Sequence, residues 1–220
     1  MQQSLFGCAI ETQPVTTDSS AQDILNASVF DACYTVIDLE TTGLNPKKNA
    51  ITEITAIQFV KNVDTGKYTT LVKPTEPIPP EVEQLTGIGN ELVQGAPAPV
   101  IVLSELCAFM GPSPVLVGHN VQFDVSFLRE KLDQTGLGTY LPRVNPETAL
   151  CTKKLAQKLM PGLPSYEGVV VATQCGVYNP NPHRAESDVR MSAGILFALL
   201  KRLDPSIQTV ADLIAFQNGQ

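Results

Sequence analysis

The sequence of 220 residues has no apolar run of the roughly 18 residues that a membrane helix needs, so we expect no membrane span. A basic segment followed by an apolar stretch is also missing near the N-terminus, and we therefore expect no secretory signal. Internal repeats and low-complexity tracts are absent as well, which excludes repeat architectures. An apolar content of 43% in a chain of this length suits one globular domain with a sizeable core.

Cysteines are few and odd in number, and none has the close spacing of a metal-binding motif. The five are Cys8, Cys33, Cys107, Cys151 and Cys175. Neither a disulfide framework nor a zinc site is therefore expected. We interpret them as reduced thiols, which are typical of a cytoplasmic protein.

Basic residues are also scarce, with 15 lysines and arginines against 22 acidic residues and a net charge of -7. Proteins that hold long nucleic-acid duplexes are usually basic, because the phosphates that they contact are negatively charged. The acidity therefore argues against an extended groove for a duplex. It remains compatible with a protein that contacts few phosphates, holds cations and is recruited by a partner.

Periodic patterns predict an α/β domain in which one mixed sheet is flanked by helices. Strands are predicted at 34–39, 51–61, 67–73 and 115–117, with a hairpin turn at 64–66. A short helix is predicted to begin at 79–80, and further helices cover 97–110, 121–134, 152–159, 166–175, 185–203 and 210–216. Asn120 is expected to cap the helix at 121–134. Polar residues near the N-terminus predict a flexible arm at 1–30, followed by the folded domain at 31–220.

Asp38 and Glu40 form an acidic pair in an otherwise apolar strand. Side chains alternate along a strand, so both acids point to one face, about 7 Å apart at their α-carbons. Val36 shares that face, whereas Ile37 and Leu39 take the other. A solvent-facing polar edge would explain the pair, but it fits poorly with an apparently central strand, where unpaired carboxylates are costly. A functional role is therefore favoured.

Two further stretches each combine an acid with a histidine. Asp124 follows His119 in the first turns of one predicted helix, and Asp188 follows His183 in the first turn of another. The helix dipole favours acids at both places, so each acid alone is readily explained as structural. His119 fits a packing or hydrogen-bonding histidine at a strand end, and His183 fits an exposed one in a proline- and asparagine-rich loop.

Together the four carboxylates and His183 match the needs of phosphodiester hydrolysis. Hard cations such as Mg²⁺ prefer oxygen ligands. Two cations about 4 Å apart can stabilise both the attacking and the leaving oxygen of a phosphoryl displacement. A histidine with an ordinary pKa near 6.5 can take a proton from the attacking water. Two such cations would also offset four of the chain's negative charges.

In their order and spacing, the stretches 36–44, 118–124 and 183–188 resemble the DEDDh branch of the DnaQ-like exonucleases, which share the ribonuclease H-like fold. Non-catalytic phrases at 79–88 and 161–166 extend the resemblance over roughly 33–203. The resemblance implies a 3′–5′ exonuclease that uses two Mg²⁺ or Mn²⁺ ions and releases nucleoside monophosphates. It further implies single-stranded or frayed DNA 3′ ends as the substrate and a role in replication proofreading or repair.

The same resemblance assigns roles to individual residues. The metal ligands would be Asp38, Glu40, Asp124 and Asp188. The general base would be His183. The terminal nucleotide would contact the backbone around Thr41 and Thr42 and the side chains of Leu44 and Phe123. One departure is visible at Gly168, where the family usually has an apolar residue, and it predicts a weaker helix and puts substrate choice near the site in doubt.

Residues 2–6 carry a second, smaller signal. Gln2, Leu5 and Phe6 resemble the short peptide by which bacterial replication proteins bind the sliding clamp. The apolar pair would fill a pocket while the glutamine amide fixes the register. A frayed terminus explains the same residues equally well. A working tether would raise the local concentration of the enzyme at the clamp and the replicative polymerase without a basic patch.

Two alternatives stay open. An enzyme of the same fold could act on RNA 3′ ends or short oligoribonucleotides, although the clamp-like peptide favours DNA. A non-catalytic adaptor could link clamp and polymerase, but the five intact site residues argue against it. Within the leading interpretation, a polymerase subunit and an independent repair or trimming exonuclease are both possible.

Overall fold

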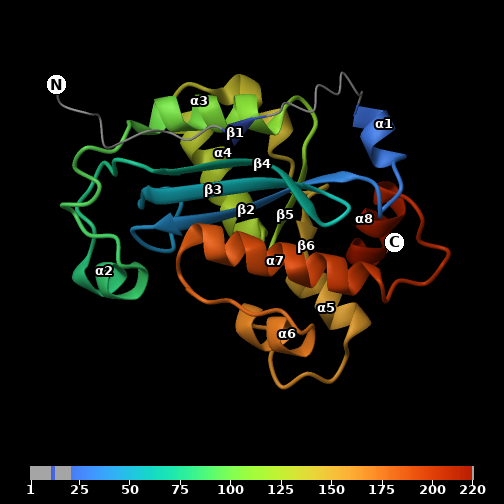
Figure 1. Ribbon diagram of the computed structural model, residues 1–220. Coiled ribbons are helices and arrows are strands. Elements are labelled where there is room, and N and C mark those ends of the chain that lie inside the picture. Colours follow the sequence, from blue (N-terminus) through green and yellow to red (C-terminus); the bar gives the residue numbers. More distant parts are fainter. Residues whose placement is uncertain (1–10, 13–20, 220) are drawn as a thin grey trace.

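The computed structural model describes residues 11–12 and 21–219, which form one mixed sheet with helices on both faces (Figure 1). The strands are β1 (Glu11–Thr12), β2 (Cys33–Thr41), β3 (Ile51–Val60), β4 (Val63–Leu71), β5 (Val115–Gly118) and β6 (Leu150–Cys151). Their order across the sheet is β1-β4-β3-β2-β5-β6. Strand β3 runs antiparallel to both of its neighbours, β2 and β4, whereas β5 runs parallel to β2 and β6 runs parallel to β5. The predicted mixed sheet is confirmed.

The helices follow the predicted order closely. They are α1 (Ala21–Leu25), α2 (Pro80–Thr86), α3 (Pro99–Met110), α4 (Gln122–Gln134), α5 (Thr152–Leu159), α6 (Gly168–Gln174), α7 (Ala185–Leu200) and α8 (Val210–Asn218), with a 3₁₀ helix, η1 (Gly138–Arg143). Every predicted helix has a counterpart. The elements α1, η1, β1 and β6 were not predicted, because elements so short show little periodicity.

Two local predictions are wrong. The turn between β3 and β4 is formed by Lys61 and Asn62, both with positive φ, as a tight hairpin turn requires. The predicted turn at 64–66 lies within β4 instead, where Gly66 pairs with Gln58. Asn120 does not cap α4 through its side chain; its own φ is 68°, and its carbonyl accepts a hydrogen bond from the Phe123 N–H.

Two apolar layers cover the two faces of the sheet. Helix α7 packs on β2 and β3 from one side, and α3 and α4 pack on the sheet from the other (Figure 1). Along β2 the side chains alternate as predicted. Val36 joins the core under α7, whereas Ile37 and Leu39 join the core under α3 and α4. Asp38 and Glu40 therefore continue the α7 side of the strand.

The N-terminal boundary differs from the prediction of a flexible arm up to residue 30. Helix α1 lies against α8. Val29 is fully buried, and its N–H donates to the carbonyl of Gln208. The Val210 N–H donates in turn to the carbonyl of Ala27. Residues 21–30 therefore pack on the domain, because their apolar side chains complete its core. Residues 2–6, with the clamp-like peptide, lie outside the described residues.

Within residues 21–219, no helix combines the length and the apolar character that crossing a bilayer requires. The four cysteines in that range carry free thiols, as predicted.

Candidate active site

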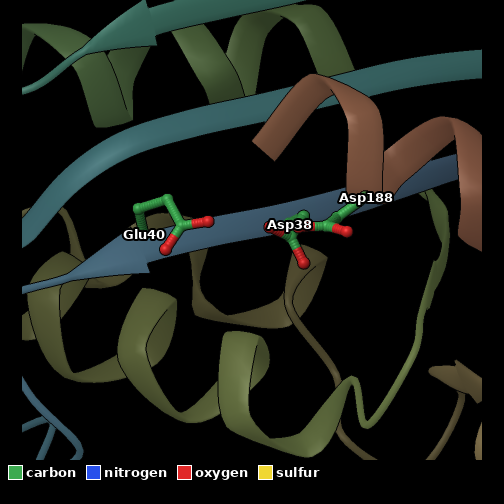
Figure 2. A group of neighbouring side chains, drawn as sticks. All are labelled: Asp38, Glu40 and Asp188. Atoms are coloured by element: carbon green, nitrogen blue, oxygen red, sulfur yellow. The ribbon is translucent and has the colours of Figure 1, made fainter. Parts of the chain in front are cut away.

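Three of the predicted carboxylates meet at the end of β2. Asp38 and Glu40 extend from the strand, and Asp188 reaches them from the first turn of α7 (Figure 2). One carboxylate oxygen of each residue lies within 4.8 Å of those of the other two. The register between β2 and β3 shifts between Glu40 and Thr41, and such bulges are common beside active sites, where they redirect side chains.

The fourth predicted carboxylate, Asp124, lies beside this group rather than within it. It comes from the first turn of α4 and is only 4% exposed. Its Oδ1 atom accepts a hydrogen bond of 3.1 Å from the backbone N–H of Leu39. Asp124 is thereby fixed to the strand between Asp38 and Glu40, and its negative charge acts on the Asp38 carboxylate.

Burial and mutual repulsion raise the pKa values of these acids. Burial is the largest cause for Asp38, followed by the charges of Asp124, Asp188, Glu40 and Glu53. Burial and the charges of Asp188 and Glu53 raise the pKa of Glu40 to about 7. Burial raises the pKa of Asp124 to about 8, although backbone hydrogen bonds oppose the shift. Clustered carboxylates that repel one another gain free energy when they bind protons or cations.

This donor set fits a hard divalent cation. Carboxylate oxygens are the ligands that Mg²⁺ and Mn²⁺ prefer. Among the described residues, no side chain or backbone N–H donates a hydrogen bond to the carboxylate of Asp38 or Glu40. Asp38, Glu40 and Asp188 could therefore hold a metal ion with their own oxygen atoms.

The loop before α7 is attached to Asp188. The Asn179 side-chain amide donates to Oδ1 of Asp188 at 2.6 Å, and the backbone N–H of His183 donates to Oδ2 at 2.9 Å. His183 has a φ of 62° and an exposed side chain. The predicted histidine therefore lies beside Asp188 in a loop that leaves its imidazole accessible to a substrate.

His119 is half-buried and does not belong to this group. Its Nδ1 atom lies 2.9 Å from Oγ1 of Thr152, and its Nε2 atom lies 2.9 Å from the carbonyl oxygen of Tyr166. Burial lowers its pKa. The interpretation of His119 as a hydrogen-bonding, structural histidine is confirmed.

The residues predicted to contact a nucleotide surround the end of β2. Thr41 donates through its hydroxyl to the carbonyl of Gly43. The Thr42 hydroxyl donates to Glu76, and its backbone N–H donates to the carbonyl of Ala50, so the backbone carbonyl is the polar group of Thr42 that could contact a nucleotide. Leu44 lies in the loop that follows β2 and is 86% exposed. A side chain at Gly43 would collide with Asn49, since an added β-carbon would lie 2.8 Å from its amide.

Two further residues from the sequence analysis are Phe123, a predicted nucleotide contact, and Gly168, the departure from the family pattern. The Phe123 ring is half-buried and packs against Phe127, with 4.9 Å between ring centroids. The unexpected Gly168 begins α6, and an added β-carbon there would lie 2.8 Å from Cε of Met191. A larger residue would require the flexible Met191 side chain to move, so the glycine leaves room for Met191 between α6 and α7.

Sequence reasoning missed three residues of this region. Glu53 is a buried acid in β3, directly opposite Glu40. Arg184 pairs with Glu53, and Asn179 contacts Asp188. Glu53 is a single acid in an apolar central strand, and the sequence alone could have indicated that it is buried and paired, because a buried acid needs a partner. The sequence offers no comparable signal for Asn179.

Comparisons with known proteins agree on one family. A family model described as an exonuclease, RNase_T, matches residues 35–196. The chain is 34% identical over 176 residues to the DNA polymerase III subunit epsilon of Aquifex aeolicus, covering 80% of this chain and 84% of that protein. It is 34% identical to the PolC-type DNA polymerase III of Clostridium perfringens, covering 79% of this chain but only 12% of that protein. It is also 30% identical to the 3′-5′ exonuclease DinG of Bacillus subtilis, covering 77% of this chain and 18% of that protein.

Solved structures show the same fold. E. coli exonuclease I in complex with a dT13 oligonucleotide matches with a TM-score of 0.63 and 19% identity, over 76% of this chain and 40% of that one. Exonuclease X in complex with 5′ overhanging duplex DNA matches with a TM-score of 0.58 and 24% identity, over 82% of this chain and 99% of that one. The predicted ribonuclease H-like exonuclease fold is confirmed.

Proposed function

Because this chain belongs to the RNase_T family of DnaQ-like 3′–5′ exonucleases, we propose that it removes nucleoside monophosphates from DNA 3′ ends during replication proofreading or repair. One observation carries the proposal. Three carboxylates from β2 and α7 lie within 4.8 Å of one another, with the loop of His183 attached to one of them. Such a cluster suits phosphodiester hydrolysis and has no obvious purpose in the core of a structural protein.

The proposed metal ligands are Asp38, Glu40, Asp124 and Asp188. Their four negative charges match two divalent cations, and their oxygen atoms favour Mg²⁺ or Mn²⁺. When bound, two such cations would stabilise the charges that develop on the attacking and leaving oxygens. Asp124 would have to share its oxygens between a cation and the Leu39 N–H, which its two carboxylate oxygens allow.

His183 is the proposed general base. Its side chain is exposed, and its backbone N–H is bound to Asp188, so the imidazole can approach a water near the metal ligands. A neutral imidazole nitrogen accepts a proton from that water as the new phosphorus–oxygen bond forms and the bond from phosphorus to the 3′ oxygen of the preceding nucleotide breaks. That 3′ oxygen takes up a proton from solvent water. The solvent-exposed loop then lets the proton leave to bulk water.

The terminal nucleotide is proposed to bind at the loop that follows β2. The exposed Leu44 side chain would contact the base, and the backbone at Thr41 and Thr42 would contact the terminal sugar. Phe123 would pack beside the nucleotide. A site of this size contacts few phosphates, which accounts for an exonuclease with a net charge of -7.

DNA is favoured over RNA as the substrate. The Aquifex relative is named as a DNA polymerase subunit, and the two solved neighbours hold DNA. The clamp-like peptide of Gln2, Leu5 and Phe6 further supports recruitment to replicating DNA, with the sliding clamp and a replicative polymerase as partners. The reduced cysteines support a cytoplasmic location. We retain a division into an N-terminal arm and an exonuclease domain, with the domain beginning no later than Ala21.

End-labelled substrates test the proposed activity. Single-stranded DNA, a primer with a mismatched 3′ end, a fully paired primer and RNA of the same sequence are each incubated with Mg²⁺ or Mn²⁺. We expect stepwise shortening from the 3′ end, faster on the single-stranded and mismatched DNA, and none in the presence of a chelator. Faster degradation of RNA than of both DNA forms would instead assign the enzyme to RNA ends.

A further inference from the structure

Glu53 is a buried acid that the proposed chemistry does not use. It lies in β3 as the register partner of Glu40, so both side chains share the face of the sheet under α7. The residue is only 6% exposed. Its charge contributes to raising the pKa values of Asp38, Glu40 and Asp188. Glu53 is therefore a fifth carboxylate at the edge of the metal-ligand group.

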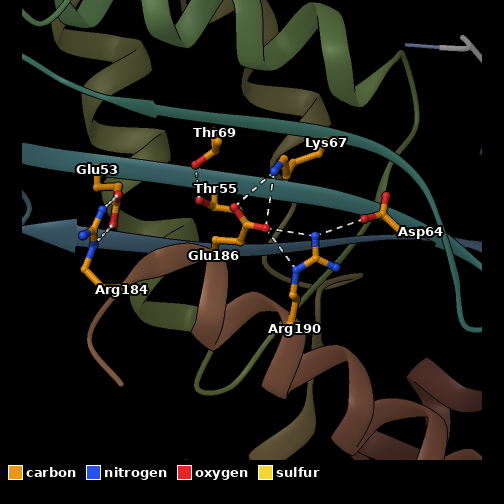
Figure 3. Close-up of polar contacts among 8 residues, drawn as sticks. All are labelled: Glu53, Thr55, Asp64, Lys67, Thr69, Arg184, Glu186 and Arg190. Carbon is orange, nitrogen blue, oxygen red and sulfur yellow. Dashed lines mark hydrogen bonds and ion pairs between the residues drawn. The ribbon is translucent and has the colours of Figure 1, made fainter. Parts of the chain in front are cut away.

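Both oxygens of Glu53 are already occupied by hydrogen-bond donors. Arg184 donates from Nη2 to Oε1 at 2.8 Å and from Nε to Oε2 at 3.4 Å (Figure 3). The backbone N–H of Ala185, the first residue of α7, donates to Oε2 at 3.0 Å. Asp38 and Glu40 differ in this respect, because no described residue donates to their carboxylates. Glu53 is therefore satisfied by the protein, whereas the β2 acids remain available to cations.

The charges of these residues also separate Glu53 from the proposed metal ligands. Asp38, Glu40, Asp124 and Asp188 carry four negative charges, which two divalent cations would neutralise. Glu53 and Arg184 neutralise each other, so the fifth acid adds no net charge to the site. Arg184 also opposes the upward shift in the pKa of Glu40.

The pair joins the two halves of the site. Glu53 belongs to the sheet, next to the strand that carries Asp38 and Glu40. Arg184 directly follows His183, and one turn of α7 separates it from Asp188. The Glu53 contacts with Arg184 and Ala185 therefore attach the start of α7 to the sheet at the place where the metal ligands converge.

We propose that Glu53 is a positioning residue, which through Arg184 and the Ala185 N–H fixes the start of α7 against the sheet. This contact sets where Asp188 and His183 lie relative to the carboxylates of β2. The inference rests on the proposed roles of those residues. Partners of metal ligands commonly change metal affinity or activity by about 10- to 100-fold when they are removed.

A second set of ion pairs on α7 provides a matched control. Glu186 receives hydrogen bonds from Lys67 of β4 and from Arg190, and Arg190 also contacts Asp64 (Figure 3). These side chains are partly exposed and also link α7 to the sheet. Exposed ion pairs of this kind contribute little to stability. Glu186→Gln therefore alters an α7–sheet contact one residue beyond Ala185 without touching the Glu53 pair.

The test measures Mn²⁺ affinity by calorimetry, and kcat and KM on single-stranded DNA. The proteins compared with the wild type are Glu53→Ala, Glu53→Gln, the double variant Glu53→Gln with Arg184→Gln, and the control Glu186→Gln. We expect Glu53→Ala to weaken Mn²⁺ binding and lower kcat by at least about tenfold, with a smaller change in KM. The double variant replaces the ion pair by two neutral amides that can hydrogen-bond, so it should recover part of both losses relative to Glu53→Gln. Glu186→Gln should match the wild type.

Three outcomes would overturn the proposal. They are wild-type Mn²⁺ affinity and kcat in Glu53→Ala, an equal loss in Glu186→Gln, or no recovery in the double variant. If Glu53→Ala does not fold, the comparison of Glu53→Gln with the double variant decides. Failure of the proposed function is distinguishable, since it would appear as a wild-type enzyme without metal-dependent nuclease activity.

Discussion

The backbone N–H of His183 donates a hydrogen bond of 2.9 Å to Oδ2 of Asp188. The loop that carries the proposed base is thus attached to a proposed metal ligand through its main chain and not through the imidazole. Removal of the His183 side chain should therefore leave the position of Asp188 unchanged. This separation allows base catalysis and metal binding to be tested independently.

We predict that His183→Ala lowers kcat by about 10²- to 10⁴-fold, the usual contribution of a general base. Mn²⁺ affinity should stay close to that of the wild type, because the backbone hydrogen bond to Asp188 does not depend on the side chain. Single-turnover kinetics and calorimetry on the same preparation measure the two quantities. A large loss of Mn²⁺ affinity would instead identify His183 as a metal ligand.

Much of the fold and part of the site could be predicted from the sequence, because they depend on local patterns. The alternation along β2 placed Asp38 and Glu40 on one face, and the structure confirms this. The convergence of Asp188 on that face followed only from the resemblance, since helix packing over a sheet is not encoded locally. Asn120 misled the prediction because its preference for helix caps is equally a preference for a left-handed backbone.

Glu53 shows why the remainder could not be predicted. Its role depends on the register between β2 and β3, which places it opposite Glu40, and on its contact with Arg184. Arg184 is 131 residues away in the chain. Neither relationship follows from composition or periodicity. The apolar strand marks Glu53 as unusual, but its neighbour Glu40 follows only from the pairing of β2 with β3, and its partner Arg184 only from the packing of α7 on the sheet.

Glu76 should control nucleotide binding through the loop that follows β2. Its Oε1 atom accepts hydrogen bonds from the Thr42 hydroxyl at 2.5 Å and from the Ala50 N–H at 2.6 Å. We predict that Glu76→Ala loosens the loop that presents Leu44 and raises KM several-fold more than it lowers kcat. Steady-state kinetics on single-stranded DNA measure this split.

Glu76→Gln is the matched control for that loop. Oε1 of Glu76 accepts both the Thr42 and the Ala50 hydrogen bond, and the carbonyl oxygen of a glutamine side chain can accept the same two. The KM of this variant should therefore remain near the wild-type value. Equal KM values for Glu76→Ala and the wild type would show that the loop does not hold the nucleotide.

The stability of the metal-free protein should decrease as the pH rises. Burial and mutual repulsion raise the pKa values of the site acids in the fold, to about 7 for Glu40 and about 8 for Asp124. In the unfolded chain these groups titrate near pH 4. The fold then binds more protons than the unfolded chain between about pH 4 and 8, so its free energy of unfolding falls over that interval.

Calorimetric melting curves at several pH values, with a chelator or with excess Mg²⁺, measure this effect. We expect a falling melting temperature between pH 5 and pH 8 with the chelator and a smaller fall with Mg²⁺, because cations replace the lost protons. Glu40→Gln should flatten the profile of the metal-free protein. A profile that is the same with and without Mg²⁺ would count against a cation site at these acids.

The N-terminal peptide should act in recruitment and not in chemistry. We predict that Leu5→Ala together with Phe6→Ala abolishes capture of the enzyme by a bacterial sliding clamp in a pull-down, with unchanged rates on short oligonucleotides. Thr16→Ala with Thr17→Ala, in the same N-terminal segment, is the control and should bind as the wild type does. No clamp binding by the unaltered protein would remove this partner from the proposal.

The assignment of the β2 carboxylates as metal ligands is tested most directly by the rate of nucleotide release from 5′-labelled single-stranded DNA by Asp38→Ala in saturating Mn²⁺. Asp133→Ala, which removes an exposed acid from α4, is the matched control. We predict no measurable release by Asp38→Ala and a wild-type rate for Asp133→Ala. A wild-type rate in Asp38→Ala would contradict the assignment.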